Sequence, residues 1–198
     1  MHEPRLKYSL GIGYAVAPVG ADHQMNVHDT TYTTDNDSIW RVNSALPPEL
    51  QIKPMPAQVL DEDKLRLFYL ELNFAHFQDC AINCQFYPYS YEQYAEVLTG
   101  VTGCEYTIAD ILAVGERAQT LCRLFNLREG FTAEDDRLPK RIRKAFDSGP
   151  IAGHEISDEL FDWARRRWYE HMAWDPQTGV PTARALERLD LNELLTPS

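Results

Sequence analysis

Histidines, carboxylates and cysteines that could do chemistry gather in a few short stretches of the chain. The first stretch holds Asp22, His23, His28 and Asp29. Imidazole titrates near neutral pH and a neighbouring carboxylate orients it, so these residues could form an acid/base pair or bind a divalent metal. The histidine spacing fits no common zinc pattern. The alternative is that both aspartates cap turns and both histidines bond to backbone.

The second stretch is DCAINC, which contains Asp79, Cys80 and Cys84. Thiolate is a soft ligand suited to iron–sulfur or zinc sites, and a buried carboxylate needs a donor partner. Free cysteine also often just fills core space, so packing is the alternative. Cys104 and Cys122 have no partner at metal spacing, and for them we expect packing.

The third stretch, LFNLREGF at 124–131, leads to DDRLP at 135–139. Its alternating charges beside Gly130 are typical of a helix exit followed by a turn. This pattern predicts an architectural role.

Helices must position these residues. Acidic residues at 61–63 predict a helix start, and the helix from Asp61 to Asp79 is apolar nearly all round. We therefore expect a central, buried helix, with DCAINC buried at its end. Truncating its Phe68 or Phe74 to Ala should cost about 3–5 kcal/mol.

Caps and periodicity predict further helices. They are expected over Tyr8 to Ala17 before Pro18, from Ser90 to a stop at Gly100, from Thr107 onward, after Ser157, and over Thr182 to Leu195. The residues expected on the inward face of the helix after Thr107 are Ile108, Ile111, Leu112, Gly115, Ala118, Cys122 and Phe125. Leu160, Trp163 and Phe125 are expected in the core. Residues 22–58 read as a long irregular excursion.

No alternating run of β-branched residues predicts a strand. The predicted fold class is therefore all-α, an irregular helical bundle with long loops. The bundle would span residues 1–198. It could also divide into two closely packed subdomains, 1–100 and 101–198.

Composition excludes some functions. Among 198 residues, 30 acidic against 19 basic side chains give a formal charge of −11, which argues against binding nucleic acid or an anionic membrane. No apolar run approaches the ~20 residues of a membrane helix, and the N-terminus lacks the apolar core of a signal peptide. The expected location is cytoplasmic, with reduced cysteines.

Four strings, taken in order, resemble the C-terminal helical part of the aldehyde ferredoxin oxidoreductase family. They are GYAVAPVGADH, DCAINC, the long string from TIADILAVGERAQ to DDRLP, and WDPQTGVPTARALERLDL. The resemblance implies helical domains that close over a tungsten or molybdenum bis-pterin held mainly by a missing N-terminal domain. It also implies oxidation of a small aldehyde with water to a carboxylic acid, one [4Fe–4S] cluster, and ferredoxin or another electron-transfer protein as partner.

The same resemblance assigns roles to residues of this chain. Cys84 occupies the position of a family ligand of the [4Fe–4S] cluster, and Asp79 that of a carboxylate that hydrogen-bonds a pterin. Asn83 lies in the same cofactor-binding motif. His23 falls at a proton donor or substrate-orienting group. His23 and Asp79 are then expected to face one cavity.

Departures from the family pattern limit what the chain can do alone. Ile82 and Asn83 stand where the family has glycine and leucine, and Val19 and Met25 replace basic residues. The three upstream cluster cysteines are missing. We therefore expect the isolated chain to be inactive and to hold neither tungsten nor a cluster stably. The alternatives are a diverged binding or partner-interaction module without cofactor, and a chain in which Asp79 and Cys84 merely pack.

Overall fold

The computed structural model describes residues 2–34, 51–84, 86–87 and 89–195. Over these ranges the regular structure is helical, and the only strand-like features are two isolated bridges, Phe146 with Ala152 and Trp174 with Pro181. The all-α prediction is confirmed. No helix within the same ranges combines the length and apolar character needed to cross a membrane.

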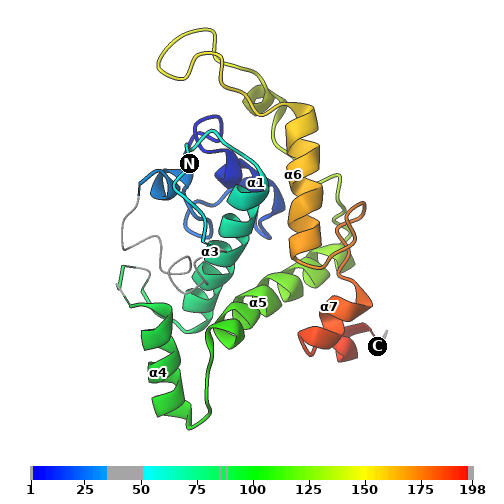
Figure 1. Ribbon diagram of the computed structural model, residues 1–198. Helices are drawn as coiled ribbons and strands as arrows, with labels where there is room; N and C mark the ends of the chain where they lie inside the picture. Colours follow the sequence, from blue (N-terminus) through cyan, green and yellow to red (C-terminus); the bar gives the residue numbers. More distant parts are fainter. Residues whose placement is uncertain (1, 35–50, 85, 88, 196–198) are drawn as a thin grey trace.

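The helices follow the order in Figure 1. They are α1 (Tyr8–Val16), α3 (Glu62–Cys80), α4 (Tyr91–Thr102), α5 (Ile108–Arg128), α6 (Asp158–His171) and α7 (Ala183–Arg188), with short 3₁₀ helices η1 (Asp29–Tyr32), η3 (Lys140–Arg143) and η4 (Asn192–Leu195). Each helix that the sequence predicted is present, although α7 and η4 divide the last one.

The predicted central helix is α3, which packs against α5, α6 and α1 (Figure 1). Both of its sides are covered. Leu65 and Phe68 lie in the main core with residues of α1 and α6, whereas Phe74 and Phe77 form a second cluster with α4 and α5. The aromatic rings continue across these contacts, since Phe68 lies 5.4 Å from Trp168 between ring centroids.

The predicted inward face of α5 is right in its first half and wrong in its second. Ile111 and Gly115 are buried, but Phe125 is 55% exposed and Cys122 is exposed. The buried positions there are polar instead, and they find partners outside α5: Gln119 donates to Asn73 and Arg123 pairs with Asp136. Hydrophobic periodicity cannot detect such a face. Leu160 and Trp163 are partly buried against the main core.

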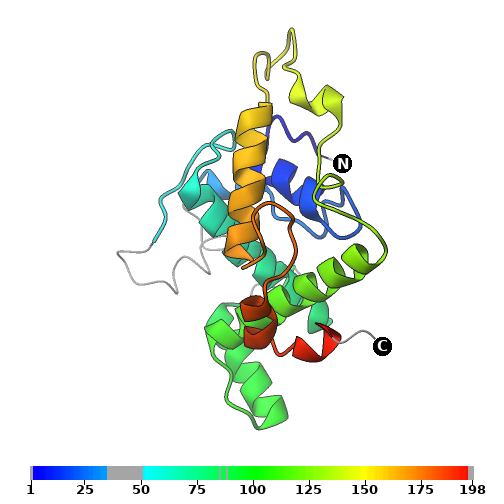
Figure 2. The same cartoon turned by 90° about the vertical axis from the view of Figure 1, so that its right-hand side faces the viewer.

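Side-chain caps set the helix starts as predicted. Ser90 with Gln93 and Thr107 with Asp110 form complete capping boxes. The predicted stop of α4 at Gly100 is wrong, because the helix continues to Thr102 and Gly103 takes the left-handed conformation. Figure 2 shows α4 at the lower end of the molecule, away from α1 and α6, whereas α5 packs against α3.

Candidate functional site

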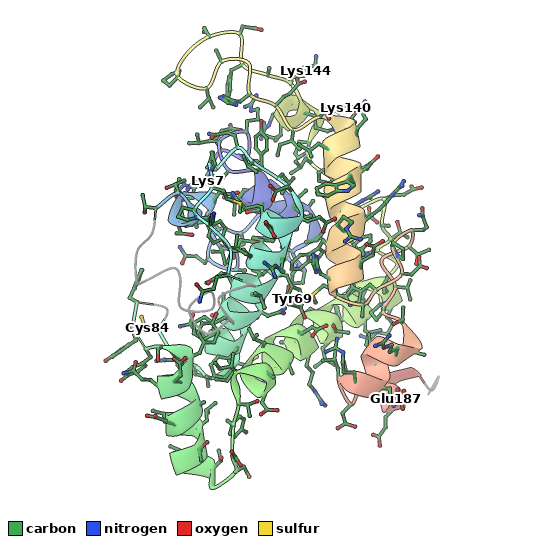
Figure 3. The ribbon with its side chains drawn as sticks, viewed as in Figure 1. Lys7, Tyr69, Cys84, Lys140, Lys144 and Glu187 are labelled. Atoms are coloured by element: carbon green, nitrogen blue, oxygen red, sulfur yellow. The ribbon has the colours of Figure 1, made fainter. Side chains whose placement is uncertain are left out.

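Three of the predicted site residues line one hollow. Asp79, Asn83 and Cys84 face it together with Gln24, Met25 and Phe86, and its volume is about 430 Å³. The residues come from the end of α3 and from the loop that carries His23. Figure 3 shows Cys84 just beyond α3, on the connection to α4.

The end of α3 explains how these residues are presented. The backbone N–H of Asn83 donates to the Gln78 carbonyl, and the backbone N–H of Ile82 donates to the Asp79 carbonyl. This pair of hydrogen bonds is a Schellman motif. Ile82 takes the left-handed conformation that the motif requires, with φ of 54°, and its side chain is 95% exposed. The backbone turn is therefore of the type that favours glycine, although a β-branched residue occupies it.

A hydrogen bond from Asn83 anchors the turn to α4. Its side-chain nitrogen donates to the Tyr94 hydroxyl, which also accepts from Gln78 at 2.9 Å. Tyr94 is buried beside Phe77. These contacts hold the backbone between Asp79 and Cys84 in place, so Asn83 positions the turn as well as lining the hollow.

The expectation that DCAINC is buried is wrong for this chain. Asp79, Cys80 and Cys84 are exposed, and so are Cys104 and Cys122, for which packing was expected. The change is local, since Phe77 and Gln78 in the same last turn of α3 are buried. Partial desolvation, with further contributions from Asp79 and Cys122, still raises the pKa of the Cys80 thiol.

His23 belongs to a cluster of three imidazoles. Its ring centroid lies 5.2 Å from that of His2 and 6.0 Å from that of His28. Its Nε2 atom is 2.8 Å from Nε2 of Gln24, which lines the hollow. His23 itself is not among the lining residues, so the structure places it beside the wall, and the shared cavity with Asp79 stays a prediction.

Lys7 ties the imidazole cluster to α1. Its Nζ lies 2.8 Å from Nδ1 of His28 and 3.4 Å from Nδ1 of His2. Burial, followed by the charge of Lys7, lowers the pKa of both histidines. These shifts favour the neutral form of His2 and His28. Sequence reasoning missed His2 and Lys7 because only the tertiary fold brings them to His23.

A buried ion pair fixes the loop that carries His23 and His28. Asp29 accepts from the backbone N–H groups of Ser9 and Leu10 in the first turn of α1, and Lys64 of α3 donates to it at 3.2 Å. Both charged side chains are completely buried. Burial lowers the pKa of Lys64, and Asp29 opposes that shift. Asp29 therefore caps α1, as well as joining the loop to α3.

The side chains at the hollow could form one part of a site for an iron–sulfur cluster and a pterin. Cys84 offers an exposed sulfur and Asp79 an exposed carboxylate at one hollow. Within the described ranges, no group of three or more histidine, cysteine, aspartate or glutamate side chains could hold a metal ion. A cluster bound at Cys84 would thus need its remaining ligands from outside these residues.

Comparisons with known proteins extend over nearly the whole chain. The family model described as "Aldehyde ferredoxin oxidoreductase, domains 2 & 3" matches residues 1–191. The tungsten-containing aldehyde ferredoxin oxidoreductase of Pyrococcus furiosus is 29% identical over 174 residues, which are 84% of this chain and 28% of that protein. Its namesake from Pyrococcus horikoshii is 25% identical over 198 residues, 96% of this chain and 32% of that protein.

The chain therefore spans about 30% of the length of these curated relatives. Among solved structures, the active-site complex BamBC of benzoyl coenzyme A reductase matches with a TM-score of 0.54 and 20% identity, over 66% of this chain and 19% of that one. That likeness supports the helical fold. With the family model matching 191 of its 198 residues, this chain belongs to the aldehyde ferredoxin oxidoreductase family and corresponds to its domains 2 and 3.

Proposed function

We propose that this chain is the helical part of a tungsten-pterin, iron–sulfur aldehyde oxidoreductase that a separate N-terminal cofactor domain or subunit completes. The observation that carries the proposal is the hollow at which Asp79, Asn83 and Cys84 meet, with His23 beside its wall. The complete enzyme would convert an aldehyde and water into a carboxylic acid, two protons and two electrons, and ferredoxin would accept the electrons.

Each residue has a distinct task in this proposal. The bound bis-pterin metal would supply the two-electron chemistry. Asp79 would accept hydrogen bonds from the pterin N–H groups as an ionised carboxylate. Cys84 would bind one iron of the cluster as thiolate. His23 would orient the aldehyde or move a proton at an imidazole nitrogen as water adds, which is a task suited to imidazole.

The isolated chain is proposed to be inactive and to hold no cofactor stably, because Cys84 alone cannot satisfy a four-ligand cluster. The cytoplasmic location and the division into subdomains 1–100 and 101–198 stay predictions. Whether the complete enzyme uses tungsten or molybdenum would be decided by metal analysis, with tungsten expected from the names of the relatives.

Co-expression with the gene that neighbours its own tests the proposal. The anaerobically purified complex should contain tungsten and iron and reduce a viologen dye when an aldehyde is added. Cys84→Ser should lower the iron content, whereas replacement of another exposed thiol, Cys104→Ser between α4 and α5, should not. Equal iron loss in both variants would contradict the assignment of Cys84.

His23→Ala in the same complex should separate proton transfer from electron transfer. Turnover should fall by about 10²–10⁴-fold with unchanged metal content, because general acid–base catalysis contributes that much. A complex that forms without metal and without aldehyde-dependent dye reduction would favour the alternative, a binding module that has lost its cofactor.

A further inference from the structure

The DDRLP stretch, which the sequence indicated to be architectural, lines a second cavity. This pocket has a volume of about 480 Å³ and lies between the end of α1 with its following turn, one face of α5, and residues 131–142. Figure 2 shows the chain leaving α5 and passing α1 on its way to η3. The Asn126 side chain bridges two of these walls by donating to the Pro18 carbonyl at 2.9 Å.

Most of the pocket wall is apolar. Representative lining side chains are Tyr14, Val16, Phe131, Leu138, Ile142 and Trp174. Of these, Phe131 remains 53% exposed, and Val19, also part of the wall, is 70% exposed. A cavity of this size with a mainly apolar wall and few charged groups has the usual form of a small-molecule site.

The buried polar groups of the wall are already engaged. Arg123 and Asp136 pair at 2.8 Å, and Arg123 also donates to the Gly179 carbonyl. Gln119 donates to Asn73 of α3 at 2.7 Å. Asp135 accepts from the backbone N–H and the hydroxyl of Thr132. Each of these side chains therefore already has a partner within the chain, although the buried Nη2 atom of Arg123 makes no hydrogen bond with the residues that the structure describes.

Arg137 and Arg141 differ from these side chains in their pairing. Both line the pocket and are exposed, and within the described part of the chain neither guanidinium forms a hydrogen bond or an ion pair. The carboxylate near Arg141 is that of Glu3, which Arg5 binds at 2.8 Å. Lys140, also exposed, follows in the same basic segment, and Figure 3 places it far from Cys84.

The charges select the ligand class. Three arginines and two aspartates in the wall leave one net positive charge, in a chain whose formal charge is −11. A monoanion matches this balance, whereas a dianionic phosphate would leave one uncompensated negative charge beside the Asp135 carboxylate. We propose that this pocket binds a monocarboxylic acid whose apolar body packs between α1 and α5 and whose carboxylate is bound by Arg137 and Arg141. The pocket is a different cavity from the hollow at Asp79 and Cys84.

Titration of the isotope-labelled chain with 4-phenylbutyrate, followed by NMR and calorimetry, tests this site without any cofactor. We expect resonance shifts confined to residues that line the pocket, and a dissociation constant on the order of 0.1–1 mM, as befits so small a ligand. The neutral 4-phenylbutyramide should bind about tenfold more weakly, because it loses the charge-assisted hydrogen bonds.

The double variant Arg137→Gln/Arg141→Gln should lower the affinity for the acid about tenfold and leave that for the amide unchanged. Arg166→Gln, an exposed arginine of α6 outside the pocket, is the matched control and should change neither. Equal binding of acid and amide, tighter binding of phenyl phosphate, no binding at all, or shifts confined to the hollow at Asp79 and Cys84 would each overturn the proposal.

Discussion

Ile82 shows how one residue can retain a backbone conformation that its type disfavours. The left-handed region is strained for β-branched side chains, yet two backbone hydrogen bonds of the Schellman motif and the contact between Asn83 and Tyr94 hold the turn in that region. Asp79 and Cys84 consequently flank a turn of the glycine-compatible type. The strain lies in the site itself, where tertiary contacts over-determine the backbone.

Ile82→Gly should therefore stabilise the chain. Glycine relieves the left-handed strain, and almost no burial is lost from a side chain that is 95% exposed. After the greater unfolded-state entropy of glycine is subtracted, a gain of about 0.5–1 kcal/mol is expected. Urea unfolding measures it. Ile82→Ala, which keeps a Cβ atom in the left-handed region, should gain less, and a glycine variant less stable than the parent would argue against a strained turn.

Four helix ends in the described part of the chain share one geometry but differ in residue type. α3, α5, α6 and α7 all end in Schellman motifs, with Ile82, Gly130, Ala173 and Asp190 at the left-handed position. Only α5 uses glycine. Glycine-based signals thus find one of these ends and miss the others, whereas the polar caps at the helix starts are apparent from sequence because their bonds span only three residues.

Two glycines on neighbouring helices offer a matched comparison of helix packing. A Cβ atom on Gly115 of α5 would lie 1.8 Å from the Asn73 carbonyl oxygen of α3, whereas one on Gly100 of α4 would meet nothing within 4 Å. Gly115→Ala should destabilise the chain by about 1–3 kcal/mol, because backbone must move. Gly100→Ala should stabilise it by about 0.5–1 kcal/mol through helix propensity. Urea unfolding of both variants checks this, and an equal effect would contradict the close approach of α3 and α5.

Imidazoles spread over the whole molecule make folding sensitive to mild acid. Burial is the largest cause that lowers the pKa of His2, His28, His76 and His171, with nearby cations adding to the effect at all but His76. The native state therefore favours the neutral form of these side chains. The unfolded chain binds protons at higher pH than the native chain does, so stability rises with pH in this range.

Stability should thus be fully present above the unfolded histidine pKa of 6.5 and decrease as pH falls through it toward the lowered native values. Urea midpoints at pH 7.5 and at a pH just above the range where carboxylates titrate measure the loss. His76→Gln removes one of these groups and should show a smaller loss. A midpoint that does not change over this range would contradict neutral burial of the histidines.

Local sequence determined the helices, their polar caps, the central place of α3 and the family, because helix periodicity and capping depend on residues three or four positions apart. Tertiary structure alone decided the rest. In its second half the inward face of α5 is polar because Asn73 and Asp136 provide partners from outside α5. Asp79, Cys80 and Cys84 are exposed although Phe77 and Gln78, just before them, are buried. His2 and Lys7 reach His23, and Gln24 reaches the hollow, through contacts between distant segments that spacing along the chain does not encode.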